Sequence, residues 1–122
     1  MNVYIRIALS MNIQFYAKNV ELSDKMKVHI SSKLEAGLKH FKRVVGAQID
    51  VSRDQHHRKG DVYRVEVNLH IPRKIIRGIA TATDVFAAMD IAQERIEKQV
   101  SRFRDKIKTE RKRGWRVWVK QS

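Results

Sequence analysis

The feature that most constrains the fold of this chain is the changing spacing of its apolar residues. Between Met26 and Val45 they recur every three or four positions, which is typical of a helix with one buried face. Between Tyr63 and Ile71 they alternate strictly with polar residues, which is typical of a strand with one buried face. A chain with both patterns must bury its helices against a sheet, because neither apolar face is stable in water.

Six segments follow these two patterns, and their order defines the expected fold class. Ser23 and Asp84 are placed to cap two helices, the first about 20 residues long and the second reaching about Lys108. Strands are expected at 13–17, 47–52, 63–71 and 75–83. We therefore predict an α+β fold of order β-α-β-β-β-α, in two layers, with a four-stranded sheet and two long helices on one face. Small residues at 78, 80 and 82 would let a helix lie close to the last strand.

The length of 122 residues fits one domain. We expect residues 11–108 to form it, with 1–10 as an extra N-terminal leader and 109–122 as a basic C-terminal tail. An added edge strand is the alternative for the leader. The tail contains Trp115 and Trp118, which either stack on unpaired bases or pack on the body. No apolar run approaches the roughly 20 residues that span a bilayer, so we expect no membrane contact and a cytoplasmic location.

The charge indicates the kind of partner. Twenty-six Lys and Arg against thirteen Asp and Glu give a net charge of +13, and residues 11–108 alone carry +8 of it. Such a field attracts polyanions at long range. Because the body itself is basic, the sequence favours a binding surface on the folded domain.

The second helix carries the clearest charge pattern. Four cations spaced by three or four residues form a stripe beside its apolar seam, while carboxylates occupy the opposing flank. The cations are Arg95, Lys98, Arg102 and Lys106, and the carboxylates are Asp90, Glu94, Glu97 and Asp105. The alternative is an ordinary solvated helix with ion pairs four residues apart. If the first helix lies alongside, the basic flanks of the two helices could merge into one groove.

The sequence shows little that would support catalysis or metal binding. There is no cysteine, the glycines are scattered, and no triad pattern stands out. His56 and His57 are neighbours on an expected loop, an arrangement that rarely places both imidazoles on one ion. We therefore expect no enzyme activity, cofactor, metal or small-molecule substrate. An enzyme acting on RNA would have to rely on these histidines, His70 and Glu66.

Several short segments are typical of one known family. They are residues 11–13, 19–23, 33–34 and 40–44, and most specifically the run ATATDVFAAMD at 80–90. Through them, and over about residues 11–108, the chain resembles the ribosome hibernation-promoting factor and ribosome-associated inhibitor family. This resemblance implies the same β-α-β-β-β-α fold. It also implies a stress-phase or stationary-phase factor that binds the small ribosomal subunit across the decoding region and inhibits translation.

The resemblance also implies the partners and the site. The partners would be 16S rRNA of the small subunit and the 70S ribosome, bound by a protein that alone is a monomer. The residues that would meet rRNA phosphates lie on the second helix and, in smaller number, on the first. They are Arg95, Lys98, Arg102, Arg104 and Lys106, together with Lys33, Lys42 and Arg43.

Another RNA- or DNA-binding module that uses the same basic helix is the alternative. A double-stranded RNA-binding domain has a related element order, but it grips phosphates with lysines at the start of its last helix. Here the segment 84–90 is acidic and apolar instead. DNA binding would predict similar affinity for duplex DNA and for ribosomal particles.

Overall fold

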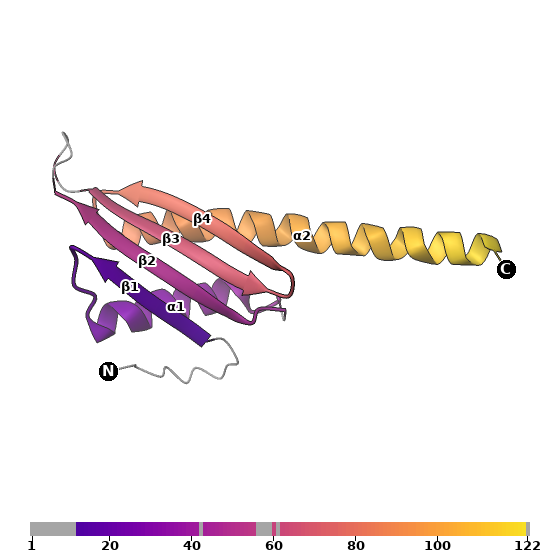
Figure 1. The fold of residues 1–122 in the computed structure, drawn as a ribbon, viewed down its shortest axis with the longest axis horizontal. Helices are drawn as coiled ribbons and strands as arrows, with labels where there is room; N and C mark the ends of the chain where they lie inside the picture. The colour runs from indigo at the N-terminus through magenta and orange to yellow at the C-terminus, as the bar shows by residue number, and fades with distance from the viewer. Residues whose placement is uncertain (1–11, 42, 56–59, 61, 122) are drawn as a thin grey trace.

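The computed structural model describes residues 12–41, 43–55, 60 and 62–121, and the side chains of the last helix as far as Lys112. Six elements follow one another in the expected order (Figure 1). They are β1 (Asn12–Lys18), α1 (Asp24–Leu38), β2 (Gly46–Asp54), β3 (Val62–Ile71), β4 (Lys74–Ala82) and α2 (Val85–Gln121).

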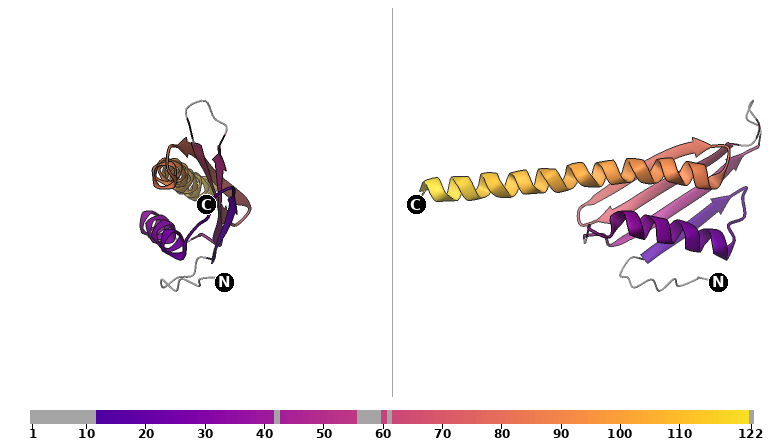
Figure 2. Two further views of the ribbon diagram at one scale, coloured as in Figure 1. Left: turned by 90° about the vertical axis from the view of Figure 1, so that its left-hand side faces the viewer. Right: turned by 180° about the vertical axis from the view of Figure 1, so that it is seen from behind.

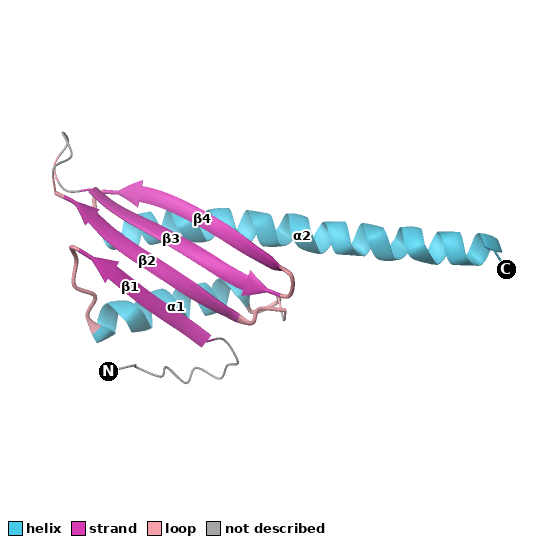
Figure 3. Ribbon diagram, in the orientation of Figure 1, coloured by secondary structure: helices cyan, strands magenta, loops and turns pink. Residues whose placement is uncertain are grey.

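The four strands form one mixed sheet in the order β1-β2-β3-β4. β1 pairs with β2 in parallel, whereas β2, β3 and β4 form an antiparallel meander. Both helices cover the same face of the sheet and leave the other face open, as the end-on view and the colouring by secondary structure show (Figures 2 and 3). The predicted fold class is therefore confirmed.

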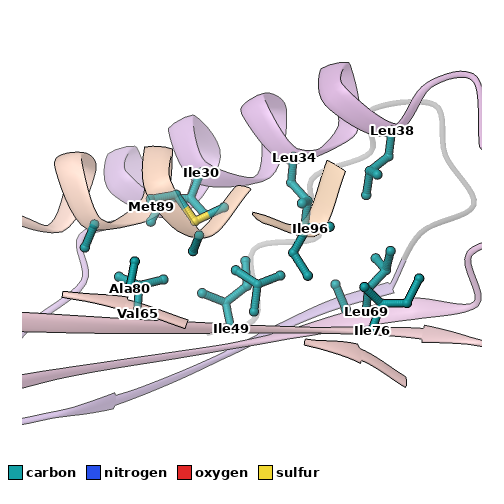
Figure 4. Packing of buried hydrophobic residues seen from close by; sticks show 14 of the residues in the cluster. Ile30, Leu34, Leu38, Ile49, Val65, Leu69, Ile76, Ala80, Met89 and Ile96 are labelled. Atoms are coloured by element: carbon teal, nitrogen blue, oxygen red, sulfur yellow. The ribbon is translucent and has the colours of Figure 1, made fainter. Parts of the chain in front are cut away.

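The core lies between the helical layer and the covered face of the sheet (Figure 4). Ile30 and Leu34 of α1, Ile96 of α2, and Ile49 and Leu69 of the sheet are each fully buried. Burying a side chain of this size stabilises the fold by roughly 1.5–3 kcal/mol. The alternation predicted for the third strand is confirmed, because its inward residues 65, 67, 69 and 71 are all buried.

Gly78 lets α2 lie directly on β4. A Cβ at this position would stand 2.6 Å from the carbonyl oxygen of Ala92 and 2.9 Å from Cγ1 of Ile96. Such separations are too short for carbon contacts, so a larger residue would push the helix off the strand. The expectation that small residues on this strand permit close packing is confirmed.

The first helix is shorter than predicted. It spans 15 residues instead of the expected length of about 20 and ends at Leu38, because the chain turns there and the backbone N–H of Phe41 donates to the Leu38 carbonyl at 2.9 Å. Phe41 is still buried, but it reaches the core from a loop. Val45, expected on the apolar stripe, is 62% exposed, and its N–H donates to the His70 carbonyl at 2.8 Å.

The second helix is longer than predicted and continues past Lys108 to Gln121. Lys, Arg and Glu are good helix formers, and no proline follows to stop them. Near the start of the helix, the apolar residue Phe86 is 41% exposed. Asp84 caps the helix, accepting from the N–H of Ala87 at 2.9 Å, and the buried positions of the first turns are taken by Val85 and Ala88.

Candidate nucleic-acid interface

One flank of α2 lies against the free edge of β4. The side-chain amide of Gln99 donates to the Arg77 carbonyl at 2.6 Å, and the guanidinium of Arg95 donates to the Ile79 carbonyl. Because Lys98, Arg102 and Lys106 follow at helical spacing, they lie on the same side of α2. The predicted cation stripe therefore runs beside the edge of the sheet, and Arg95 is partly engaged in holding that edge.

The opposite flank of α2 faces α1 and is acidic. Asp90 forms an ion pair with Lys33, and the Gln93 amide donates to the Lys33 carbonyl at 2.8 Å. One turn further, the Glu97 carboxylate lies against Gly37 of α1. The basic flanks of the two helices therefore do not merge along α1, because α2 turns its carboxylates to that helix and its cations away.

The cations on this part of α2 differ in whether they have an ion-pair partner. Lys98 lies 3.4 Å from Glu94 in a well-exposed pair, which contributes at most about 1 kcal/mol and leaves the lysine able to exchange partners. Arg102, Arg104 and Lys106 are exposed, and within the described residues none of them has an ion pair or hydrogen bond. Cations kept in water without a carboxylate partner are free to meet phosphate.

The remaining predicted site residues are spread over other elements. Lys33 lies in the seam between the helices and is paired, as described above. Arg43 is exposed in the α1–β2 loop, where the Phe41 ring packs edge-on against Phe103 of α2 at 6.2 Å. Lys42 lies outside the described residues.

One cation next to the stripe was not predicted, because it belongs to another element. The Lys74 ammonium, at the start of β4, lies 5.1 Å from the centre of the Phe103 ring. The Arg77 side chain of the same strand points to the open face of the sheet instead, where it donates to the Asn68 side chain at 2.7 Å. Only the packing of α2 on β4 brings Lys74 to the stripe. We refer to Lys74, Arg95, Lys98, Arg102 and Lys106 as the β4–α2 face.

The open face of the sheet carries a balanced polar network. Burial alone would raise the pKa of Glu66, but the Asn68 amide and the guanidinium groups of Arg64 and Arg77 outweigh it, so the pKa lies below its ordinary value. Arg64 and Asn68 each approach the carboxylate at 3.4 Å. A carboxylate held ionised in this way neutralises its neighbours and is a poor proton donor.

The described residues offer few other sites. No three of their His, Asp or Glu side chains stand close enough to hold a metal ion, and His56 and His57 lie outside them. A hollow of about 820 Å³ opens at the far end of the sheet, between Arg53, Tyr63 and Phe86. Both helices begin beside it, but Ser23 and Asp84 cap them. Over the same described part, neither helix has a window apolar enough to cross a membrane.

The fold and the site define a two-layer α+β protein with one strongly cationic helix face. The family model described as "Sigma 54 modulation protein / S30EA ribosomal protein" matches residues 13–108, and the chain belongs to this family. The resemblance seen in the sequence is thereby confirmed.

Three relatives illustrate the match. The proteins named ribosome hibernation promotion factor are 27% identical over 101 residues in Deinococcus radiodurans and 31% over 99 residues in Mycobacterium tuberculosis. They align with 83% and 79% of this chain but with only 53% and 44% of their own length, so the chain spans about half of each. The ribosome hibernation promoting factor of Azotobacter vinelandii is 21% identical and is covered over 94% of its length.

Solved structures share the fold. A ribosomal subunit interface protein from Coxiella burnetii superposes with a TM-score of 0.69 at 19% identity, covering 78% of this chain and 99% of its own. The N-terminal domain of Thermus thermophilus Protein Y gives a TM-score of 0.65 at 26% identity, with coverages of 76% and 99%.

Proposed function

We propose that this chain is a ribosome hibernation factor that binds the small ribosomal subunit across the decoding region and inhibits translation. The β4–α2 face would meet 16S rRNA phosphates, in free subunits and in 70S ribosomes. The protein would act in the cytoplasm as a monomer and as a binding factor without catalysis, during stress or stationary phase.

The observation that carries this proposal is the uncompensated charge of the β4–α2 face. Its outermost cations, Arg102 and Lys106, are exposed on α2 and lack carboxylate partners among the described residues. Phosphate contacts release condensed counterions and supply a large share of the affinity of such surfaces. The names of the relatives support the ribosome as the source of that phosphate.

The test is co-sedimentation of the full chain with 30S and 70S particles over a range of salt. Lys98, Arg102 and Lys106 are changed together to Gln, and Arg95 is left in place because it also holds the edge of β4. Three lost phosphate contacts should weaken binding and reduce the slope of log K against log salt by about 2–3 units. A variant with Lys18, Lys25 and Lys27 changed to Gln loses the same charge elsewhere and should keep the slope.

The outcomes separate this proposal from its rivals. Unchanged co-sedimentation of the first variant at every salt would remove the β4–α2 face from the interface. Equal affinity of the wild-type chain for a DNA duplex and for 30S particles would favour the DNA-binding alternative. In a translation assay, inhibition should follow occupancy of 30S and fall in the first variant alone.

A further inference from the structure

The flank of α2 that faces α1 changes its sign of charge where α1 ends. Alongside α1 it carries Asp90 and Glu97, which meet Lys33 and Gly37 of that helix. Past the end of α1 at Leu38, the same flank carries a row of cations. These are Arg104, Lys108, Arg111 and Lys112, and all four are exposed.

This second row lies opposite to the outer part of the β4–α2 face. At 3.6 residues per turn, Arg104 and Lys108 point to the side of the helix away from Arg102 and Lys106. The apolar line of Phe103 and Ile107 separates the two rows on the inner side. Here α2 leaves the sheet and projects as a single rod (Figure 1), so its two flanks have no protein layer beside them.

The loops at the base of the rod extend each row separately. Lys74, which lies over Phe103, belongs to the β4 side. On the other side, Phe41 packs against the same ring and brings the α1–β2 loop, with exposed Lys39 and Arg43, to this part of α2. The cations of the protein body are thus arranged to continue both rows.

The protein does not neutralise this charge itself. Residues 98–112 hold seven basic side chains and two acidic ones. The pairs 98–102, 102–106, 104–108 and 108–112 place like charges four residues apart, two pairs in each row, and each pair costs a few tenths of a kcal/mol in an isolated helix. Anions on both flanks would relieve this repulsion, whereas a single strand of phosphates would relieve half of it.

We infer that the projecting part of α2 lies between two RNA backbone strands, with one strand along each row of cations. The inference rests on the proposed function and names the geometry of its RNA site. A helix with its side chains is about 10–12 Å across. The regular major groove of A-form RNA is narrow. The site would therefore be a widened groove or the gap between two RNA helices.

Two variants test the rows against each other by binding to 30S particles across a salt range. One changes Arg102 and Lys106 to Gln, and the other changes Arg104 and Lys108 to Gln. Each should reduce the slope of log K against log salt by about 1.5 units, and the combined variant by about 3. An unchanged slope in the second variant alone would overturn the two-strand geometry while leaving the proposed function intact.

The absence of cysteine allows a direct map of the RNA. Lys106→Cys and Lys108→Cys each introduce one attachment point for a hydroxyl-radical probe, on opposite flanks of the exposed rod. With the labelled full chains bound to 30S particles, we expect cleavage centred on two different rRNA strands. Cleavage of a single strand by both probes would overturn the inference, and failure of the wild-type chain to bind 30S would overturn the proposed function as well.

Discussion

At the scale of single residues, two glutamates show opposite responses to their surroundings. One carboxylate oxygen of Glu35 is buried on α1 and has no hydrogen-bond partner among the described residues, and burial raises the pKa of this group. Glu66 is also shielded, but its hydrogen bonds and neighbouring guanidinium groups lower its pKa. The ionised form of the carboxyl group is therefore disfavoured at Glu35 and favoured at Glu66.

A pH prediction follows for Glu35. Because its pKa is raised in the folded state, the stability linked to it is present below the unfolded pKa and is lost as pH rises through the folded value. Glu35→Gln should therefore raise the free energy of unfolding by roughly 0.5–1 kcal/mol at pH 7 and change it little near pH 4. Urea denaturation at both pH values measures the difference.

Glu66→Gln provides the matched control with the opposite sign. Its lowered pKa contributes stability above the unfolded pKa that is lost as pH falls through the folded value. This variant should be less stable than wild type at pH 7, and the deficit should shrink in acid. A Glu35→Gln variant that also lost stability at neutral pH would show that its carboxylate is not the unfavourable group.

At the scale of elements, the contact between α2 and β4 provides hydrogen-bond donors for backbone carbonyls at the edge of the sheet. β4 is an edge strand, and the outward carbonyls of such strands are open to pairing with other chains. Gln99 and Arg95 donate to the carbonyls of Arg77 and Ile79, so side chains of α2 occupy part of that edge. The helix is thereby fixed in register along the strand.

The hydrogen bond donated by the Gln99 side-chain amide should contribute measurably to the stability of this contact. Gln99→Ala removes one hydrogen bond and should cost about 0.5–1.5 kcal/mol in the free energy of unfolding. Gln99→Glu keeps the shape but places a carboxylate against the Arg77 carbonyl, so its loss should be larger. Denaturation of both variants, with solvent-facing Lys98→Ala as the control, tests the order, and equal losses for the Ala and Glu variants would contradict a donor role.

Local patterns predicted most of the elements because local physics determines them. The alternation around Val65 and the caps at Ser23 and Asp84 depend on neighbours in the sequence, and all were confirmed. The predicted length of α1 was wrong, because Phe41 keeps the helical spacing of apolar residues but reaches the core from a loop after the helix. Periodicity alone does not distinguish these two ways of burying a ring.

The candidate site was predicted in part for a similar reason. The cation stripe of α2 is visible in one segment, because its spacing is that of a helix. Lys74 joins it only through the packing of β4 against α2, a contact between distant parts of the sequence. Which flank of α2 would face α1 was likewise decided by topology, and the ion pair of Lys33 with Asp90 follows from it.

At the scale of the whole molecule, the charge is distributed unevenly between the two layers. On the open face of the sheet, Glu66 lies among Arg64, Arg77 and Asn68, so charges there are paired. On the far half of α2 the cations greatly outnumber the carboxylates. The net charge of +13 therefore destabilises the free protein by self-repulsion in the same region that would attract RNA.

Salt should consequently have opposite effects on folding and on binding. Raising monovalent salt from about 10 mM to about 150 mM shortens the screening length from about 30 Å to about 8 Å. Repulsion between the cations of the free protein then weakens, and its melting temperature should rise by a few degrees. Affinity for 30S particles should fall over the same range, because each released counterion gains less entropy when the salt concentration in solution is higher.

The variant with Gln at positions 102, 104, 106 and 108 separates this effect from general effects of salt on proteins. It should start with a higher melting temperature than wild type at low salt and gain less as salt is added, because four of the repelling cations are gone. Thermal unfolding followed by circular dichroism at several salt concentrations measures both slopes. Equal slopes in the two proteins would mean that the cations on the far half of α2 do not limit the stability of the free chain.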